Sequence, residues 1–182
     1  MPGRPLLPGE LSVLALLLDW PMHGYEMARC FERDDLAEVC PVEQSLLYTY
    51  LRNIEDRELV TWHEVREGKR PPRKVYVLTD AGRAAVENWL HEPVGRMRQV
   101  RLEFLLKLYF LHHSDVGAEA ALLQRQLRVC EDYRARLSER ANGTEGFPRL
   151  VAHSKLSAAE ATIGWLESYA AELERGSGGG RS

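Results

Sequence analysis

A helical alternation of apolar and polar positions is clearest between residues 41 and 57. Apolar side chains recur there at steps of three and four: Leu47, Tyr50, Leu51 and Ile54. The other side carries groups that can hydrogen-bond to bases or phosphates: Gln44, Ser45, Tyr48, Thr49 and Arg52. Pro41 precedes the helix, so its first turn is expected at residues 43–45. This arrangement is typical of a DNA recognition helix, and an ordinary surface helix can show it too.

Two more helices are predicted upstream. Residues 10–18 are apolar nearly all round, which indicates a helix buried on more than one side. A turn at residues 22–26 opens a short helix that runs to about residue 33 and points Tyr25, Ala28 and Phe31 inward. Residues 34–40 are predicted to be a connection. Three short helices in this order, the last two joined by a brief connection, are typical of a helix-turn-helix.

A β-hairpin is predicted directly after these helices. Residues 59–66 and 73–78 are rich in β-formers, and the segment 67–72 between them has turn chemistry. Four cations gather at the tip and the return: Lys69, Arg70, Arg73 and Lys74. A charge cluster is often only solvated surface, but a basic hairpin after a helix-turn-helix indicates a wing. Thr79 is expected to cap a helix over residues 80–91.

Together these segments resemble a known family. The motif PMHGYE at residues 21–26, Leu47-Tyr48 with Leu51 and Ile54, and RKVYVLTDAG at residues 73–82 resemble the PadR family of winged-helix transcriptional regulators. The similarity covers residues 6–92. The resemblance implies a homodimeric repressor of nearby genes that a small effector often relieves. By position it places Tyr48 and Arg52 on the recognition helix and residues 69–74 on the wing.

The chain departs from the family pattern at three positions. Glu58 stands where Gly is usual, Thr49 where Pro is usual, and Leu46 where a small or polar residue is usual. Glu58 is expected to affect the turn geometry only mildly. The other two departures leave the recognised base sequence undetermined.

The C-terminal half is predicted to be helical. Residues 98–113 are dense in apolar side chains and indicate a buried helix. A second helix is expected from Ser114-Asp115 to about residue 141. A break at residues 142–146 precedes a last helix over about 148–175.

The last helix has a regular seam. Apolar and small residues alternate steps of four and three over three heptads: Ala152, Leu156, Ala159, Ile163, Leu166, Ala170 and Leu173. This period of 3.5 is that of a coiled coil. The seam is expected to pack either against the preceding helix or across a dimer. The larger PadR proteins resemble this layout, and their helical C-terminal region dimerises, so the resemblance favours these residues for dimerisation.

The predicted fold class is mostly α with a small β-hairpin. A winged helix-turn-helix DNA-binding domain is expected over residues 6–92 and a helical dimerisation and effector domain over 96–175, with a plausible joint at 93–95. The glycine-rich tail, residues 176–182, is expected to be disordered.

Composition restricts the function further. The chain of 182 residues is 45% hydrophobic and 28% charged, as globular proteins are, and has a net charge of −3. Residues 1–92 carry 11 basic and 16 acidic side chains, so any DNA-binding face must be local. Three cysteines without metal-ligand spacing favour reduced thiols in the cytoplasm. No signal peptide is recognisable, and the apolar run over residues 11–18 is too short to span a membrane.

Enzyme chemistry finds no support in the motifs. His112 and His113 are adjacent, so on a helix they point about 100° apart, and no third ligand lies at useful spacing. No metal or cofactor is therefore expected. Cys30 could sense oxidants if it were exposed, although free cysteines are mostly inert core residues.

We expect a cytoplasmic homodimeric repressor that binds an imperfect palindrome in double-stranded DNA. A small aromatic effector is expected to bind between aromatic residues, although each of them is more typical of the core than of a pocket: Trp20, Trp89, Tyr109 and Trp165. The alternative is a protein-interaction or adaptor module that has lost DNA binding. Salt-dependent retention on DNA separates the two hypotheses.

Overall fold

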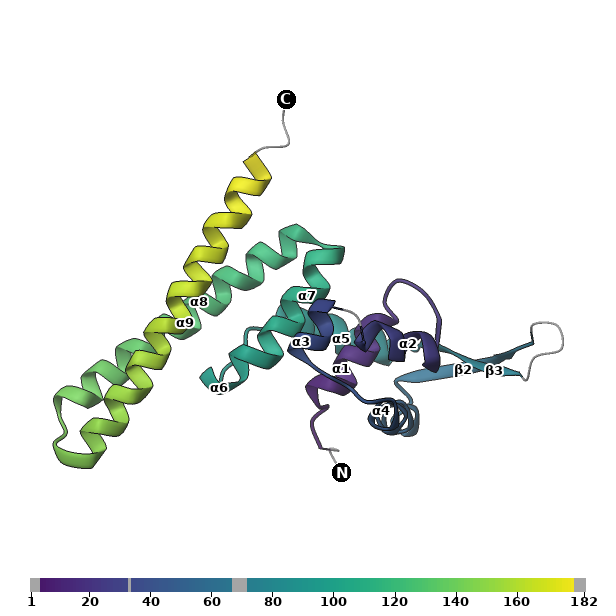
Figure 1. The fold of residues 1–182 in the computed structure, drawn as a ribbon, viewed down its shortest axis with the longest axis horizontal. Helices are drawn as coiled ribbons and strands as arrows, with labels where there is room; N and C mark the ends of the chain where they lie inside the picture. Colours follow the sequence, from purple (N-terminus) through teal and green to yellow (C-terminus); the bar gives the residue numbers. More distant parts are fainter. Residues whose placement is uncertain (1–3, 33, 67–71, 179–182) are drawn as a thin grey trace. The chain divides into compact units, whose positions relative to one another are not determined.

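The computed structural model describes residues 4–32, 34–66 and 72–178 (Figure 1). The chain forms two compact units, one of Met1–Glu92 with Arg101–His113 and the other of Pro93–Val100 with Ser114–Ser182. One boundary between the two units falls between Glu92 and Pro93, and residues 101–113 also belong to the first unit.

Among the described residues up to Glu92, the helices of the first unit are α1 (Pro8–Leu16), α2 (Gly24–Phe31), α3 (Asp34–Val39), α4 (Gln44–Asp56) and α5 (Asp80–His91). The prediction that residues 34–40 form a connection is wrong, because the fully buried Leu36 anchors a short helix there. The expectation that Tyr25 points inward is also wrong. Its side chain is 59% exposed, and the neighbouring Met27 is buried instead.

A small antiparallel sheet completes this unit, with strand order β1-β3-β2. The two predicted strands are present as β2 (Val60–Val65) and β3 (Arg73–Leu78), and Figure 1 shows them extending away from the helices as a wing. Strand β1 (Met22–His23) was not predicted, because two residues are too few to show an alternating pattern. It pairs Met22 with Tyr76 and so ties the start of α2 to the wing.

The junction between α4 and the wing is compact. The helix ends with two backbone hydrogen bonds, from Glu58 N to Glu55 O and from Leu59 N to Ile54 O, both 2.9 Å long. This pattern is a Schellman motif, which places one residue in the left-handed region, and Glu58 has φ +57°. The effect of Glu58 on the turn is therefore larger than the mild one expected, since a non-glycine residue is strained in this conformation.

The same junction holds the start of α5. Thr79 caps that helix as predicted, because its hydroxyl oxygen accepts a hydrogen bond from Gly82 N at 3.0 Å. The Thr79 hydroxyl also donates to Glu58 O at 2.8 Å. A Cβ atom added to Gly82 would lie only 1.9 Å from Leu59 O, so this close approach requires glycine.

Residues 101–113 join the first unit through a buried lysine. The single helix predicted over 98–113 is instead α6 (Met97–Gln99), a π-helical turn (Val100–Phe104) and α7 (Leu105–Ser114). Lys107 Nζ donates to Glu92 O at 2.7 Å, and Trp89 Nε1 donates to Glu103 Oε1 at 2.9 Å. Burial lowers the pKa of Lys107, and the Glu103 carboxylate partly opposes that shift.

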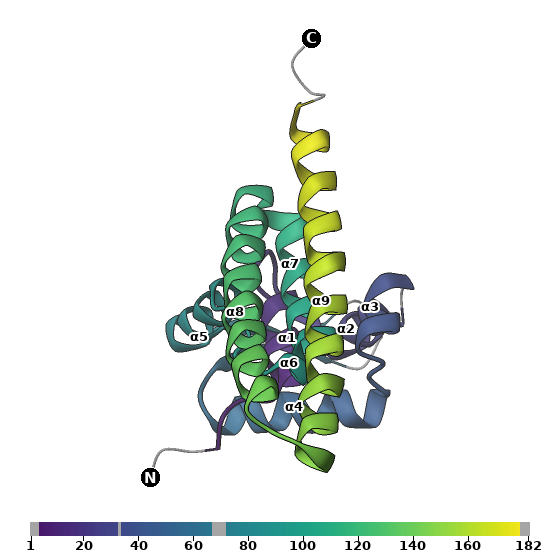
Figure 2. The same ribbon diagram turned by 90° about the vertical axis from the view of Figure 1, so that its left-hand side faces the viewer.

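The second unit is an antiparallel hairpin of α8 (Val116–Asn142) and α9 (Gly146–Gly178), which lie side by side in Figure 2. Asp115 caps α8, because its carboxylate accepts a hydrogen bond from Ala118 N at 2.9 Å. The carboxamide of Gln126 accepts from Val94 N and donates to Val94 O, at 2.7 and 3.0 Å, and so holds the segment 93–100 against α8.

Helix α9 ends later than the sequence predicts. It continues to Gly178, so the tail expected from residue 176 begins within a helix, and residues 179–182 lie outside the described part of the chain. Along α9, the Tyr169 hydroxyl donates to the buried carboxylate of Glu119, and burial together with this bond raises the pKa of Tyr169. This contact adds a polar tie to the apolar packing of the hairpin.

The left-handed conformation at residue 58 gives a stability prediction. Glu58→Gly should raise the free energy of unfolding by about 1 kcal/mol, because glycine adopts positive φ without the Cβ clash. Glu58→Ala is the matched control: it removes the same exposed side chain but keeps the Cβ, so a change within about 0.5 kcal/mol is expected. Urea denaturation of the full chain measures both. A glycine variant no more stable than the alanine variant would show that the turn carries no strain.

Candidate nucleic-acid interface

Helix α4 has one buried side and one free side. Leu47, Leu51 and Ile54 are buried, and α1 and α2 pack against the helix. All five side chains predicted to contact DNA are exposed: Gln44, Ser45, Tyr48, Thr49 and Arg52. The Thr49 hydroxyl donates to Ser45 O at 3.1 Å within the helix. Its proton is therefore already used, and Thr49 can offer a base only its methyl group or an acceptor oxygen.

The buried side of α4 is positioned by a carboxylate from α1. Glu10 is fully buried and accepts hydrogen bonds from Leu7 N and from Asn53 Nδ2, both at 2.9 Å, and it pairs with the Arg4 guanidinium. Burial alone would raise the pKa of Glu10, but these donors outweigh it and lower that pKa. Glu10 therefore stays ionised and links the arm before α1 to α4.

A close approach sets the spacing between the same two helices. A Cβ atom added to Gly9 would lie 2.5 Å from Tyr50 Cε2, so the Tyr50 ring covers the start of α1 directly. Tyr50 is predicted on the apolar side of the helix, and in the structure its side chain is half-buried. The contact brings the backbone of α1 close to α4.

The wing brings two of its predicted cations close to α4. Arg73 and Lys74 are exposed on β3, whereas Lys69 and Arg70 lie outside the described residues. Lys74 Nζ lies 3.6 Å from Glu55 Oε1 and 3.8 Å from the centre of the Trp62 ring. Trp62 Nε1 in turn donates to Glu55 Oε1 at 2.6 Å. Helix α4, β2 and β3 are thus joined by one carboxylate, one indole and one ammonium group.

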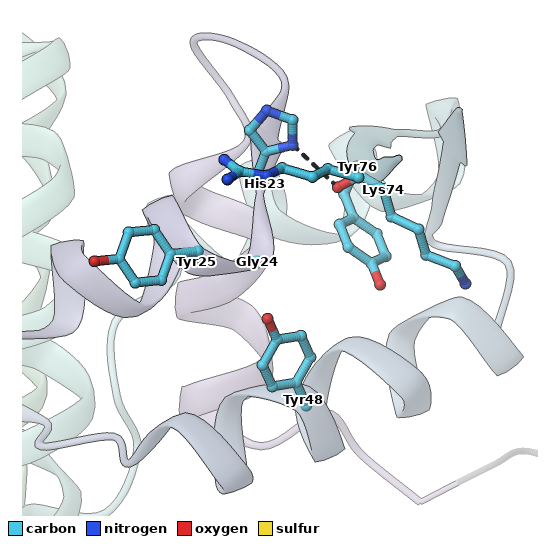
Figure 3. Close-up of a pocket in the computed structure, with 7 residues that line it drawn as sticks. His23, Gly24, Tyr25, Tyr48, Lys74 and Tyr76 are labelled. Carbon is cyan, nitrogen blue, oxygen red and sulfur yellow. Dashed lines mark hydrogen bonds between the residues drawn. The ribbon is translucent and has the colours of Figure 1, made fainter. Parts of the chain in front are cut away.

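A hollow of about 500 Å³ lies between α2, α4 and β3 (Figure 3). It is lined by aromatic and cationic side chains and by one glycine: His23, Gly24, Tyr25, Tyr48, Arg73, Lys74 and Tyr76. The hydroxyl groups of Tyr48 and Tyr76 both point into the space between α4 and β3 in Figure 3. His23 Nδ1 lies 3.3 Å from Lys74 O, a hydrogen bond when that nitrogen carries the proton.

Only part of this hollow is predictable from the sequence. Tyr48, Arg73 and Lys74 were predicted at the interface. Tyr76 and His23 were not, because their places depend on the pairing of β1 with β3. The PMHGYE motif was the only signal for that region, and it does not reveal which strand the segment meets.

The predicted seam lies largely within the hairpin. Ala152, Ala159, Ile163 and Leu166 are buried in a single chain, where α9 packs along α8. Three further seam residues are half-buried: Leu156, Ala170 and Leu173. Most of the regular spacing therefore serves intramolecular packing, one of the two arrangements that the sequence left open.

The four aromatic residues suggested for an effector pocket are not gathered in one unit. Trp20 is 59% exposed, and Trp89 is buried and bonded to Glu103. Tyr109 belongs to the first unit, whereas Trp165 belongs to the second. In the second unit a groove of about 280 Å³ opens between the start of α8 and the end of α9 instead, lined by Val116, Ala120, Leu123, Gln124, Ala170, Leu173 and Glu174.

A helix with one free polar side, preceded by a short helix and followed by a two-stranded wing, defines the winged helix-turn-helix class of DNA-binding proteins. Residues 13–88 match the Transcriptional regulator PadR-like family, and residues 100–174 match the family described as Virulence activator alpha C-term. The chain belongs to the PadR-like family, with a C-terminal domain of the second type. This family consists of transcriptional regulators rather than enzymes, in agreement with the expectation from the motifs.

Two relatives are similar to nearly the whole of this chain. The chain is 25% identical to the negative transcriptional regulator PadR of Bacillus subtilis over 91% of this chain and 97% of that protein. It is 27% identical to a probable transcriptional regulator of Mycobacterium tuberculosis, over 90% of this chain and 96% of that protein.

Two solved structures are also similar. Crystal structures of Bacillus subtilis PadR in complex with operator DNA and with p-coumaric acid are each 24% identical to this chain. The match to the DNA complex covers 93% of this chain and 99% of that chain, with a TM-score of 0.47. The match to the p-coumaric acid complex covers 94% of this chain and 98% of that chain, with a TM-score of 0.41. Within the described ranges, no helix of the chain is both long and apolar enough to cross a bilayer.

The buried seam gives the second prediction. Ile163→Asp should destabilise the hairpin by on the order of 3 kcal/mol, because it places an unpaired charge among apolar side chains of the same chain. Ala161→Asp adds the same charge at an exposed position on the same helix, and a change within about 0.5 kcal/mol is expected. Thermal unfolding followed by circular dichroism measures both. Equal melting temperatures for the two variants would contradict the intramolecular packing of Ile163.

Proposed function

We propose that this chain is a sequence-specific transcriptional repressor that binds double-stranded DNA as a homodimer. The observation that carries the proposal is the free side of α4, where five hydrogen-bonding side chains are exposed opposite a buried apolar side. The named activity of the Bacillus subtilis relative, a negative regulator, supports repression rather than activation.

The mechanism follows from this geometry. The free side of α4 enters the major groove, where Gln44 and Arg52 read base edges through bidentate hydrogen bonds. Gln favours adenine and Arg favours guanine by the geometry of their donors and acceptors. The cations of the wing bind phosphates and set the register of the protein on the duplex. Because residues 1–92 carry more acidic than basic side chains, binding depends on these few local cations.

The second unit provides the surface for dimerisation. The buried part of the seam is used within the hairpin, but apolar side chains remain outside it: Val116 at 49%, Phe147 at 73% and Leu150 at 62% exposure. Phe147 and Leu150 lie in the first turns of α9, Val116 lies beside Ala170 and Leu173 near its other end, and the half-buried Leu156 lies between. Such exposure is typical of a surface that another protein covers, and a second copy of the chain would do so with two-fold symmetry.

Release from DNA would follow from binding of a small aromatic effector. The Bacillus subtilis relative has been crystallised with p-coumaric acid, which supports an effector of this chemical kind. An effector shifts the protein away from its DNA-binding state only if it binds another state more tightly. It would act by changing the spacing of the two winged units in the dimer.

The rival function is that of a protein-interaction module. The negative charge of the N-terminal half favours it, since acidic surfaces repel DNA. The two functions differ in one simple property: retention on a DNA column that falls steeply with salt is expected for the repressor and not for the adaptor.

The recognition helix gives the third prediction. Gln44→Ala and Arg52→Ala should each relax the preference for one base pair per half-site, by about 1–3 kcal/mol of discrimination. Selection from randomised DNA with each purified variant measures the preference.

The matched control is Arg29→Ala, which removes an exposed cation from α2 at a position not predicted to read bases. Its recovered motif should equal that of the unmodified chain. If both helix variants are folded and recover the unmodified motif, α4 does not read bases and the proposed function is wrong.

A further inference from the structure

The hollow between α2, α4 and β3 combines two kinds of group that bind phosphate. Its hydroxyls are those of Tyr48 on α4 and Tyr76 on β3, which point into the same space from opposite sides (Figure 3). Its cations are Arg73 and Lys74 on β3. Neutral donors together with cations make charge-assisted hydrogen bonds to phosphate oxygens.

The two tyrosines are held in place from behind. A Cβ atom on Gly24 would lie 2.9 Å from Tyr48 Cε1, so the Tyr48 ring lies directly against the start of α2. Tyr76 is buried within the sheet, between the partners Met22 and Trp62 in register. Burial raises the pKa of Tyr76, and the charge of Glu55 and the nearby Tyr48 add to the shift. Tyr76 therefore keeps its proton at neutral pH and can donate it.

Lys74 already has an anionic partner in the free protein. Glu55 Oε1 lies 3.6 Å from Lys74 Nζ, and both side chains are about one-third exposed or more, at 34% and 44%. Pairs of this kind are weak because water screens them. Trp62 donates to the same carboxylate oxygen at 2.6 Å and keeps Glu55 beside the wing. A phosphate that enters the hollow would thus compete with a carboxylate fixed close to the same lysine.

We infer that the hollow seats one backbone phosphate of the bound DNA, and that Glu55 is the resident counter-ion which Lys74 leaves when this phosphate arrives. The inference rests on the proposed function and adds to it a specific site and a control on affinity. Tyr48 and Tyr76 donate to the phosphate oxygens, while Arg73 and Lys74 supply the charge.

Glu55 then acts as a positioning residue that sets affinity without reading sequence. Its carboxylate holds Lys74 and Trp62 in the wing of the free protein, and it stands as an uncompensated negative charge beside the DNA in the complex. Removing this charge should tighten binding to every sequence alike. The effect of Glu55 is therefore expected on overall affinity and on its salt dependence, with base preference unchanged.

The first test locates the phosphate. The probe is the duplex recovered by selection from randomised DNA, prepared as a series in which one phosphate at a time is replaced by an uncharged methylphosphonate. Affinities are measured for the unmodified chain, Tyr48→Phe and Tyr76→Phe. Several positions should weaken binding by the unmodified chain. At one of them per half-site both variants should lose less affinity than the unmodified chain loses there, because the hydroxyl bond is already missing. If the loss from the methylphosphonate and the loss from the Tyr→Phe substitution simply add at every position, the hollow does not bind a phosphate.

The second test addresses the counter-ion. Glu55→Gln keeps an acceptor for Trp62 but removes the charge, so binding to a random-sequence duplex should tighten about twofold to fivefold. The salt dependence should steepen by up to about 0.9 in log–log slope, because no carboxylate then takes up a cation to offset the counterion that the DNA releases to Lys74. Asp56→Asn removes one charge from the adjacent exposed position on α4 and should change affinity by less.

The outcomes separate this inference from the proposed function. A chain that shows no salt-dependent DNA binding would overturn both. Salt-dependent binding with no methylphosphonate position coupled to Tyr76 would overturn the seat alone. Equal effects of Glu55→Gln and Asp56→Asn would reduce Glu55 to a general contribution to net charge and overturn its role as the counter-ion.

Discussion

The approach of Gly82 to the Leu59 carbonyl is the constraint on which the DNA-binding unit depends. A Cβ atom at residue 82 would lie 1.9 Å from that oxygen, so only glycine lets α5 start directly beside the end of α4. The Thr79 hydroxyl closes the same junction by donating to Glu58 O. Helix α4, the first residue of the wing and the return from the wing into α5 are thereby joined within a few residues. The angle between the recognition helix and the wing follows from this junction.

The electrostatics of this unit are those of a local site on an acidic protein. Glu10 is buried and ionised behind α4, where it fixes the helix through Asn53. Glu55 lies on the same helix but beside the wing, where it pairs with Lys74. The first carboxylate holds α4 against α1, and the second lies beside a cation that we propose to bind DNA. A low net charge of the whole chain does not exclude a local basic site, because Arg73 and Lys74 lie next to each other on β3.

The sequence predicted the elements whose patterns are long or chemically specific. The amphipathic period located α4 and its buried Leu47, Leu51 and Ile54, and β-formers around a turn located β2 and β3. The Thr79 cap was also readable, since a capping residue acts on the backbone next to it.

The features that the sequence did not predict depend on contacts between segments that are distant along the chain. Strand β1 exists because Met22 meets Tyr76, and α3 exists because Leu36 is buried by other elements. The packing of α7 with the first unit depends on Lys107 and the carbonyl of Glu92, which no local pattern reveals. The hollow was missed for the same reason: its walls come from three elements that are neighbours only after folding.

The central claim is that α4 and the wing bind a defined DNA sequence, and sequencing the genomic fragments retained by the purified full chain tests it most directly. The account predicts that the retained fragments share one imperfect palindrome whose half-site centres lie about 10 bp apart, or a small multiple of that, because two symmetry-related helices must face the same side of the duplex. Fragments that share no motif, or whose retention does not fall with salt, would contradict it.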